Sequence, residues 1–261
     1  HSIPGPGDPD SSGIWLNDVQ SRLNATLVRA VRRPESVDEL QRLVRQAANE
    51  QRPVSISGAR HAMGGQQFGR ETLHLDLTGL NRIVDLDTDR GLVTAEAGIV
   101  WPALIAGLHR LQPGVESCWT IREKQTGVDD VTLGGSLSAN VHGRGLERPP
   151  FVGDVESFDL IDARGELLHC SRREHPQLFA LAVGGYGLFG VIARVTLRLA
   201  RRFKVRRLVS VLPVRELLDL IAERRRQGCL FGDCQYSIDL TCDAEQHPGV
   251  CACYQPVGAE T

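Results

Sequence analysis

Hydrophobic residues recur at two different periods along this chain, and these periods predict helices and strands that are interspersed. An apolar stripe with helical spacing starts at Val37. Ser36, directly before it, and Glu39, three residues after Ser36, form the pattern of a capping box. Further helices are expected over 100–111, 176–183 and 215–227. Strands are expected over 53–57, 73–77, 92–97, 188–199 and 234–240, with a hairpin over 155–170. Because few helices are scattered among many strands, the pattern predicts an α+β fold.

Composition narrows the class of protein. The chain has 261 residues, 41% of them hydrophobic, and a formal net charge of −2. These values are typical of a folded globular protein and argue against a dedicated nucleic-acid binder. Arginines cluster over 201–207 and 224–226, which leaves nucleic-acid or phosphate binding as an alternative to solvated faces. No apolar stretch is long enough to predict a transmembrane segment.

The seven cysteines are an odd number, so at least one of them has no partner within the chain. They favour a reducing compartment, and we expect a cytoplasmic protein. Their spacing lacks the paired Cys-x-x-Cys pattern of zinc sites, so we expect no metal and buried thiols instead. Residues 1–13 are rich in Pro, Gly, Ser and Asp, and ordered structure is expected only from Thr26. Residues 1–25 are therefore predicted to be a flexible tail.

Three glycine-rich segments carry the candidate chemistry, at 58–66, 132–145 and 184–190. The third contains the spacing G-x-G-x-x-G, which in dinucleotide-binding folds follows a strand and precedes a helix. Here a helix is expected before it and a strand after it, which argues against a Rossmann site. Its glycines therefore predict a tight turn or a close approach of the backbone to a flat group.

The other two segments allow both a binding and a structural interpretation. Residues 58–66 follow an expected strand, and their backbone N–H groups could hold a pyrophosphate or belong to an ordinary loop. Ser136, Ser138, Asn140 and His142 alternate along the second segment. If that segment is extended, all four side chains point to one side. Such a face could bind a polar heterocycle or simply be solvated.

Taken together, the three segments resemble the vanillyl-alcohol oxidase / p-cresol methylhydroxylase superfamily of FAD-dependent oxidoreductases. The resemblance covers residues 26–202 and includes the runs GGSLSANVHGRG and HPQLFALAVGGYGLFGVI in the family's order. Within this superfamily, the chain is similar in particular to the sugar-oxidising branch, which includes aldonolactone and alditol oxidases and decaprenylphosphoryl-ribose oxidase. The resemblance implies an FAD-binding domain of two α+β subdomains over 26–202. It also implies the start of a substrate (cap) domain over 203–261.

The resemblance implies a set of cofactor-binding residues. They are Gly58, Ala59, Arg60, His61, Ala62, Met63, Gln66, Thr132, Gly134, Gly135, Ser138, Asn140, Gly187, Gly190, Val191 and Ile192. Many members bond the flavin covalently through a histidine at the position of His61, whereas decaprenylphosphoryl-ribose oxidases lack it and bind FAD noncovalently. Both modes stay open here. Doubly linked members carry a cysteine where this chain has Val128, so any covalent attachment would be single.

The resemblance implies transfer of a hydride from a CH–OH group of a sugar-like or other alcohol to flavin N5. Oxygen or another acceptor would then reoxidise the flavin. His142 would orient or deprotonate the substrate hydroxyl, with Arg144 nearby, because a neutral imidazole can accept a proton near neutral pH. These two residues are the expected catalytic residues, and a small alcohol is the expected partner.

The cap domains of the family are longer than the residues that follow Arg202, so we expect the chain to be a piece of a longer flavoprotein. This leaves an alternative of a different class. The chain would then be a noncatalytic FAD-binding fragment, or an interaction domain that keeps the fold without flavin.

Overall fold

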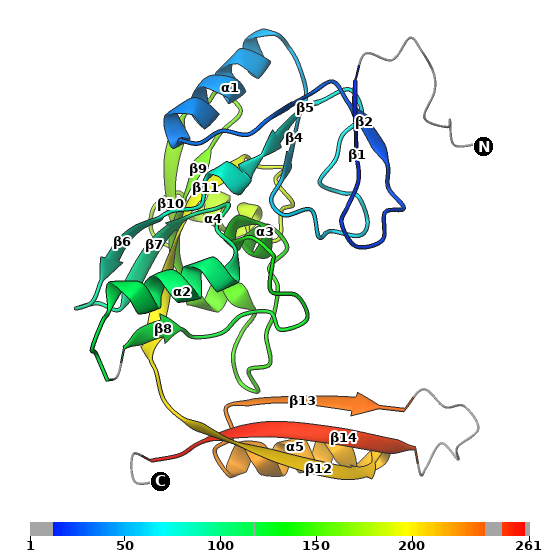
Figure 1. Ribbon diagram of the computed structural model, residues 1–261, viewed down its shortest axis with the longest axis vertical. Coiled ribbons are helices and arrows are strands. Elements are labelled where there is room, and N and C mark those ends of the chain that lie inside the picture. The colour runs from blue at the N-terminus through cyan, green and yellow to red at the C-terminus, as the bar shows by residue number, and fades with distance from the viewer. Residues whose placement is uncertain (1–12, 117, 238–246, 259–261) are drawn as a thin grey trace.

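The structure is a computed structural model that describes residues 13–116, 118–237 and 247–258. Its strands form a hairpin and three larger sheets, around which the helices pack (Figure 1). The helices are α1 (Val37–Asn49), α2 (Trp101–Leu111), α3 (Leu133–Ser138), α4 (Pro176–Ala182) and α5 (Leu217–Arg226). This mixture confirms the α+β fold that the sequence predicts.

The first sheet is parallel and is paired with α1. It contains β3 (Ala30–Arg32), β5 (Leu73–Asp76) and β4 (Val54–Ser57), in that spatial order. The hydroxyl of Ser36 accepts a hydrogen bond from the backbone N–H of Glu39 at 3.2 Å, which confirms the predicted start of α1. The predicted apolar stripe of α1 is buried in one core with Leu73 and Leu75 of β5. Burial of this stripe therefore holds the helix on the sheet.

The second sheet is larger, and antiparallel pairing runs through its centre. Its strands are β6 (Ile83–Asp87), β7 (Leu92–Glu96), β8 (Trp119–Ile121), β9 (Val155–Ile161), β10 (Leu167–Ser171) and β11 (Val191–Arg201). The spatial order is β10-β9-β11-β7-β6, and β8 pairs with β11. The first residues of β11 reach the core of α1, whereas its later residues pack with α2 and α3. One long strand thus ties the two halves of this region together.

The third sheet lies beyond β11 and has a core of its own. It consists of β12 (Val205–Pro213), β14 (Pro248–Pro256) and β13 (Phe231–Tyr236), and α5 packs against one face of this sheet (Figure 1). The strand expected over 234–240 begins earlier, and residues 238–240 lie outside the described part. None of the helices in the described ranges is long and apolar enough to cross a membrane.

Cysteines fill much of this small core, as the sequence predicts for buried thiols. Cys229, Cys251 and Cys253 are buried there, and Cys234 packs against them. Burial is the main cause that raises the pKa of Cys234 and of Cys253 to about 12, so both thiols stay protonated at neutral pH. Cys242 lies outside the described residues.

Ordered structure begins earlier than the sequence indicated. Residues 14–25, expected to belong to a flexible tail, include β1 (Ile14–Leu16), which pairs with β2 (Thr26–Val28). The carboxylate of Asp18 closes the intervening turn by accepting hydrogen bonds from the backbone of Gln20 and Arg22 and the hydroxyl of Ser21. Burial alone would raise the pKa of Asp18, but these hydrogen bonds outweigh it and lower the pKa to about 2. Such a network of hydrogen bonds around one carboxylate leaves no periodic pattern of hydrophobic residues, so the sequence did not predict order in this segment.

Candidate functional site

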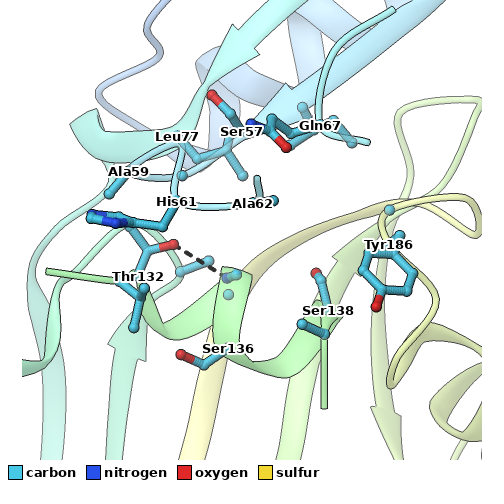
Figure 2. A pocket seen from close by; sticks show the side chains of 18 of the residues that line it. Ser57, Ala59, His61, Ala62, Gln67, Leu77, Thr132, Ser136, Ser138 and Tyr186 are labelled. Atoms are coloured by element: carbon cyan, nitrogen blue, oxygen red, sulfur yellow. Dashed lines mark hydrogen bonds between the residues drawn. The ribbon is translucent and has the colours of Figure 1, made fainter. Parts of the chain in front are cut away.

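A cavity of about 330 Å³ lies where β4 ends, and all three glycine-rich segments contribute to its wall. Figure 2 shows the side chains of Ala62, Thr132 and Ser138 around it. Parallel strands direct their carboxyl ends to one edge of a sheet, which is where α/β folds place ligands. The cavity therefore occupies the position expected for a binding site.

The 58–66 loop is held from outside by the segment that was expected to be a tail. The backbone N–H of Val19 donates to the carbonyl of Arg60 at 3.0 Å, and the side-chain amide of Gln20 donates to His61 Nδ1 at 3.0 Å. Arg60 itself has a left-handed φ of 60°. Contacts from residues 19 and 20 thus stabilise a backbone conformation that the loop sequence alone does not favour.

Residues 133–138 are helical, so the extended conformation that would place the alternating polar side chains on one side is not formed. Thr132 caps α3 by accepting a hydrogen bond from the N–H of Gly135 at 3.2 Å. Ser136 and Ser138 both contribute to the cavity wall, but the buried hydroxyl of Ser136 accepts a hydrogen bond from Trp101 Nε1 at 3.0 Å. The alternating polar residues therefore do not share one face. The buried pair Leu133 and Leu137, four residues apart, is the signal that could have revealed the helix.

Glycine at position 134 lets the backbone of α3 come close to Ala97, which directly follows β7. A Cβ atom on Gly134 would lie 2.7 Å from Ala97 Cβ, closer than real Cβ contacts allow. A Cβ atom on Gly58 would overlap the hydroxyl of Thr132. Glycine at these positions thus keeps the cavity wall thin and exposes backbone groups to a bound molecule.

The G-x-G-x-x-G segment lies between α4 and β11, which confirms the inverted order deduced from the sequence. Gly187 and Gly190 have φ values of 80° and 139°, and a Cβ on Gly190 would overlap Leu160. The glycines therefore serve a turn and a close approach, as predicted. Tyr186 also has a left-handed φ, of 50°, and its ring lines the cavity near Ser138 (Figure 2).

Most of the expected cofactor-binding residues meet at this cavity. They are Gly58, Ala59, Arg60, His61, Ala62, Gln66, Thr132, Gly134, Gly135, Ser138, Gly187, Gly190, Val191 and Ile192. Two do not line it. The side chain of Met63 is exposed, and Asn140 instead accepts a hydrogen bond from the N–H of Val152 at 3.3 Å.

Sequence reasoning missed several other residues of the wall. Ser57 and Gln67 directly flank the 58–66 loop, and Tyr186 lies within the glycine-rich segment 184–190. Their position in or next to a glycine-rich segment was the signal that could have identified them. Gln125 and Val131 come from a stretch without any motif. Only tertiary packing brings that stretch to the site.

A buried histidine lies behind the wall and fixes the direction of a hydrogen-bond chain. His74 Nδ1 lies 2.9 Å from Ser55 Oγ, and Nε2 lies 2.8 Å from Ser57 Oγ. Thr72 donates its one hydroxyl proton to the carbonyl of Gly69, so Ser55, 2.6 Å from Thr72 Oγ1, must donate to Thr72. Ser55 then accepts from Nδ1–H, and the bare Nε2 accepts the proton of Ser57. The hydroxyl of Ser57 is thereby committed to the protein.

The imidazole of His74 is neutral in this chain of hydrogen bonds. Burial is the main cause that lowers its pKa to about 4; the carboxylate of Asp76 opposes this effect, and the guanidinium of Arg60 adds to it. The ring is almost fully buried and packs at 5.4 Å from the ring of Phe68. A protonated His74 would have to donate from both nitrogens, so it would reverse the bond to Ser57.

A second cavity, of about 470 Å³, adjoins the first and contains both expected catalytic residues. Gln125 and Val141 line both cavities, so the two spaces share a wall. His142 and Arg144 line only the second. His142 Nδ1 lies 3.1 Å from the carbonyl of Gly143 and must donate to it, so in the neutral imidazole Nε2 is the nitrogen that carries no proton. This nitrogen is free to accept a proton from a ligand.

The third sheet forms part of the wall of the second cavity, through Gly232 and Asp233 of β13. Arg144 Nη1 forms an ion pair with Asp233 of β13 at 3.0 Å, and the carbonyl of Arg144 accepts from the N–H of Gly232 at 2.8 Å. The N–H of Leu146 donates to the carbonyl of Leu230 at 2.9 Å. Residues 144–146 thus run along the edge of β13, and the side chain of Arg144 is held in place. Across the described ranges, no three His, Cys, Asp or Glu residues are arranged to hold a metal ion.

Comparison with known proteins agrees with this geometry. The FAD binding domain family matches residues 28–171, more than half of the chain. The chain is 27% identical to L-gulonolactone oxidase of Bos taurus and 30% identical to L-gulono-1,4-lactone dehydrogenase of Mycobacterium tuberculosis. These matches cover 76% and 75% of this chain, and 43% of each relative. Cytokinin dehydrogenase 10 of Oryza sativa is 29% identical over 74% of this chain and 35% of its own length. The chain therefore spans less than half of the relatives it matches.

Proposed function

We propose a function for this chain from its membership of the FAD binding domain family. The chain is the cofactor-binding part of an FAD-dependent oxidoreductase, together with the start of its substrate domain. The enzyme oxidises a CH–OH group of a sugar-like or other alcohol. We assign residues 26–202 to FAD binding and residues 203–261 to the partial substrate domain. The assignment is supported by the family match within 26–202 and by the separate core of the third sheet.

The residues of the first cavity fit FAD. Its wall joins three glycine-rich segments, and Gly58 and Gly134 leave no room there for a side chain. We infer that these segments bind the cofactor through backbone groups. His61 is the candidate for a single covalent bond, because it lines the cavity and Val128 replaces the cysteine of doubly linked members.

The observation that carries the catalytic proposal is the shared wall between the two cavities. FAD, when bound, supplies the hydride acceptor at N5. His142 Nε2 would take the proton of the substrate hydroxyl, since Nδ1 already donates to Gly143. Arg144, fixed by Asp233, would donate hydrogen bonds to an oxygen of the same substrate.

The first test is a visible spectrum of the purified chain, repeated on supernatant and pellet after acid precipitation. Colour in the pellet means a covalent flavin, and its loss from the pellet in His61→Ala would identify the anchor. Colour in the supernatant means noncovalent FAD. A chain that neither carries flavin nor takes up added FAD would contradict the proposal.

The second test addresses His142 in the full-length parent protein, with L-gulono-1,4-lactone as the probe because one relative is named for it and another for L-gulonolactone. His142→Ala should lower kcat at least about a hundredfold, in the range typical for loss of a general base. The spectrum of bound flavin should be unchanged. Turnover by the variant at the wild-type rate would refute the assigned role.

A noncatalytic FAD-binding fragment is the second candidate, because the chain spans less than half of its relatives. Bleaching of the flavin colour on addition of substrate separates the two. Bleaching by the chain itself supports the enzyme. Bound flavin that bleaches only in the longer parent supports a fragment whose activity needs further residues.

A further inference from the structure

The side chain of Gln67 has an unusual position in the wall of the first cavity. Both polar atoms of its amide, Oε1 and Nε2, are inaccessible to solvent and have no hydrogen-bond partner among the described residues. The residue lies beside Ser57 and Ala62 in the cavity wall (Figure 2). No other residue of this cavity has an unpartnered, buried side-chain amide.

A buried amide without partners is costly, because it has lost its hydrogen bonds to water and gained none from the protein. Such a group in a folded protein calls for an explanation, and a ligand is one of the few available. The nearby hydroxyl of Ser57 cannot donate to Gln67 Oε1, because its proton is committed to His74. Neither atom therefore has a partner among the described residues, and a molecule in the cavity that Gln67 lines would reach them only after the side chain turns towards it.

We propose that Gln67 is a further cofactor-binding residue whose amide pairs with polar atoms of bound FAD. The amide can donate through Nε2 and accept through Oε1, so it matches a cofactor edge on which an acceptor and a donor lie side by side. A phosphate oxygen could use only the donor. The inference rests on the proposal that FAD occupies the first cavity.

The proposal predicts opposite effects on affinity and stability when the amide is replaced by an apolar group of similar size. Gln67→Leu should weaken FAD binding at least about tenfold, because polar atoms of the cofactor lose their partners. The melting temperature of the FAD-free protein should stay the same or rise, because the variant removes an unpartnered polar group. A merely structural role would lower that temperature.

The experiment measures FAD affinity by flavin fluorescence in a His61→Ala background, where the cofactor can exchange, and melting of the FAD-free protein. Gln177→Leu is the matched control, because Gln177 lies on the exposed side of α4 and away from the cavity. The control should leave FAD affinity unchanged. It also reports the effect of the same chemical change on melting outside the site.

Each outcome decides the matter. Weaker FAD binding together with unchanged or increased stability of Gln67→Leu supports the proposal. Equal FAD affinity in Gln67→Leu and its parent refutes it while leaving the cavity assignment intact, and would fit a water bound to the amide. A variant that fails to fold also refutes it, since the amide would then have a structural partner. Absence of FAD binding in the parent refutes the cavity assignment and this proposal together.

Discussion

Lowering the pH from 7.5 to 5 should destabilise the protein, because the folded state must keep His74 neutral. Burial lowers the pKa of His74 from 6.5 to about 4. Between about pH 4 and pH 6.5, the unfolded chain therefore binds more protons than the folded protein. The free energy of unfolding therefore falls as the pH drops below about 6.5, and this effect levels off below about 4. Asp18 affects stability only at lower pH. Its pKa is 3.8 ordinarily and about 2 in the folded protein, so the folded and unfolded states differ in proton uptake by Asp18 only below about pH 4.

The magnitude follows from the two pKa values of His74. Each tenfold change in proton affinity corresponds to about 1.36 kcal/mol, so the whole window amounts to about 3 kcal/mol. By pH 5 about 2 kcal/mol of this has been lost. Against a total stability of about 5–15 kcal/mol, such a loss is readily measured.

The assay is urea unfolding followed by circular dichroism at several pH values from 4 to 7.5. His74→Leu removes the titrating group, so its free energy of unfolding should depend on pH less steeply, by about 2 kcal/mol between pH 7.5 and 5. The variant should also be less stable at pH 7.5, because Ser55 and Ser57 lose their partner. His109→Leu makes the same chemical change at an exposed position and reports how much of the effect is specific to the buried site.

Two results would refute this reasoning. One is an equal pH slope in the wild-type protein and His74→Leu. The other comes from ¹⁵N NMR of the imidazole: a His74 ring that titrates near pH 6.5 has no buried neutral state to protect. The same spectrum should identify Nδ1 as the protonated nitrogen, and a proton on Nε2 would overturn the deduced direction of the hydrogen-bond chain.

Three further substitutions test the cavity and its supports. Gly58→Val should abolish FAD uptake, because the new side chain overlaps Thr132; fluorescence titration with FAD measures this, and wild-type affinity would contradict the tight approach. Tyr186→Gly should stabilise the FAD-free protein by about 1 kcal/mol in urea unfolding, since glycine tolerates the left-handed φ of 50° that strains tyrosine; a loss of stability would mean that the ring packs well enough to outweigh the strain. Arg82→Ala should lower the midpoint of urea unfolding, because the buried carboxylate of Glu96 loses the guanidinium and keeps the backbone N–H of residue 82; an unchanged midpoint would show that water replaces the guanidinium.

The local pattern of the chain was enough to predict several elements. The capping box and apolar stripe of α1, the hairpin of β9 and β10, and the alternation in β11 all depend on neighbours a few residues apart. The inverted order around the G-x-G-x-x-G segment was also readable, because it needs only the type of the flanking elements. The resemblance of the glycine-rich segments then identified the FAD-binding family, which the family match confirms.

The sequence by itself therefore determined the α+β class, the start of α1 and the family, because these depend on local spacing and on short motifs. Only the tertiary structure decided that Asp18 orders the N-terminal segment, that Thr132 and its neighbours form a helix, and that Gln67 lies in the cavity. Short polar stretches fit a helix or a strand equally well, and their hydrogen-bond partners or their lack of partners come from residues far along the chain. Burial and hydrogen bonding between distant segments settle such positions, and neither quantity has a period in the sequence.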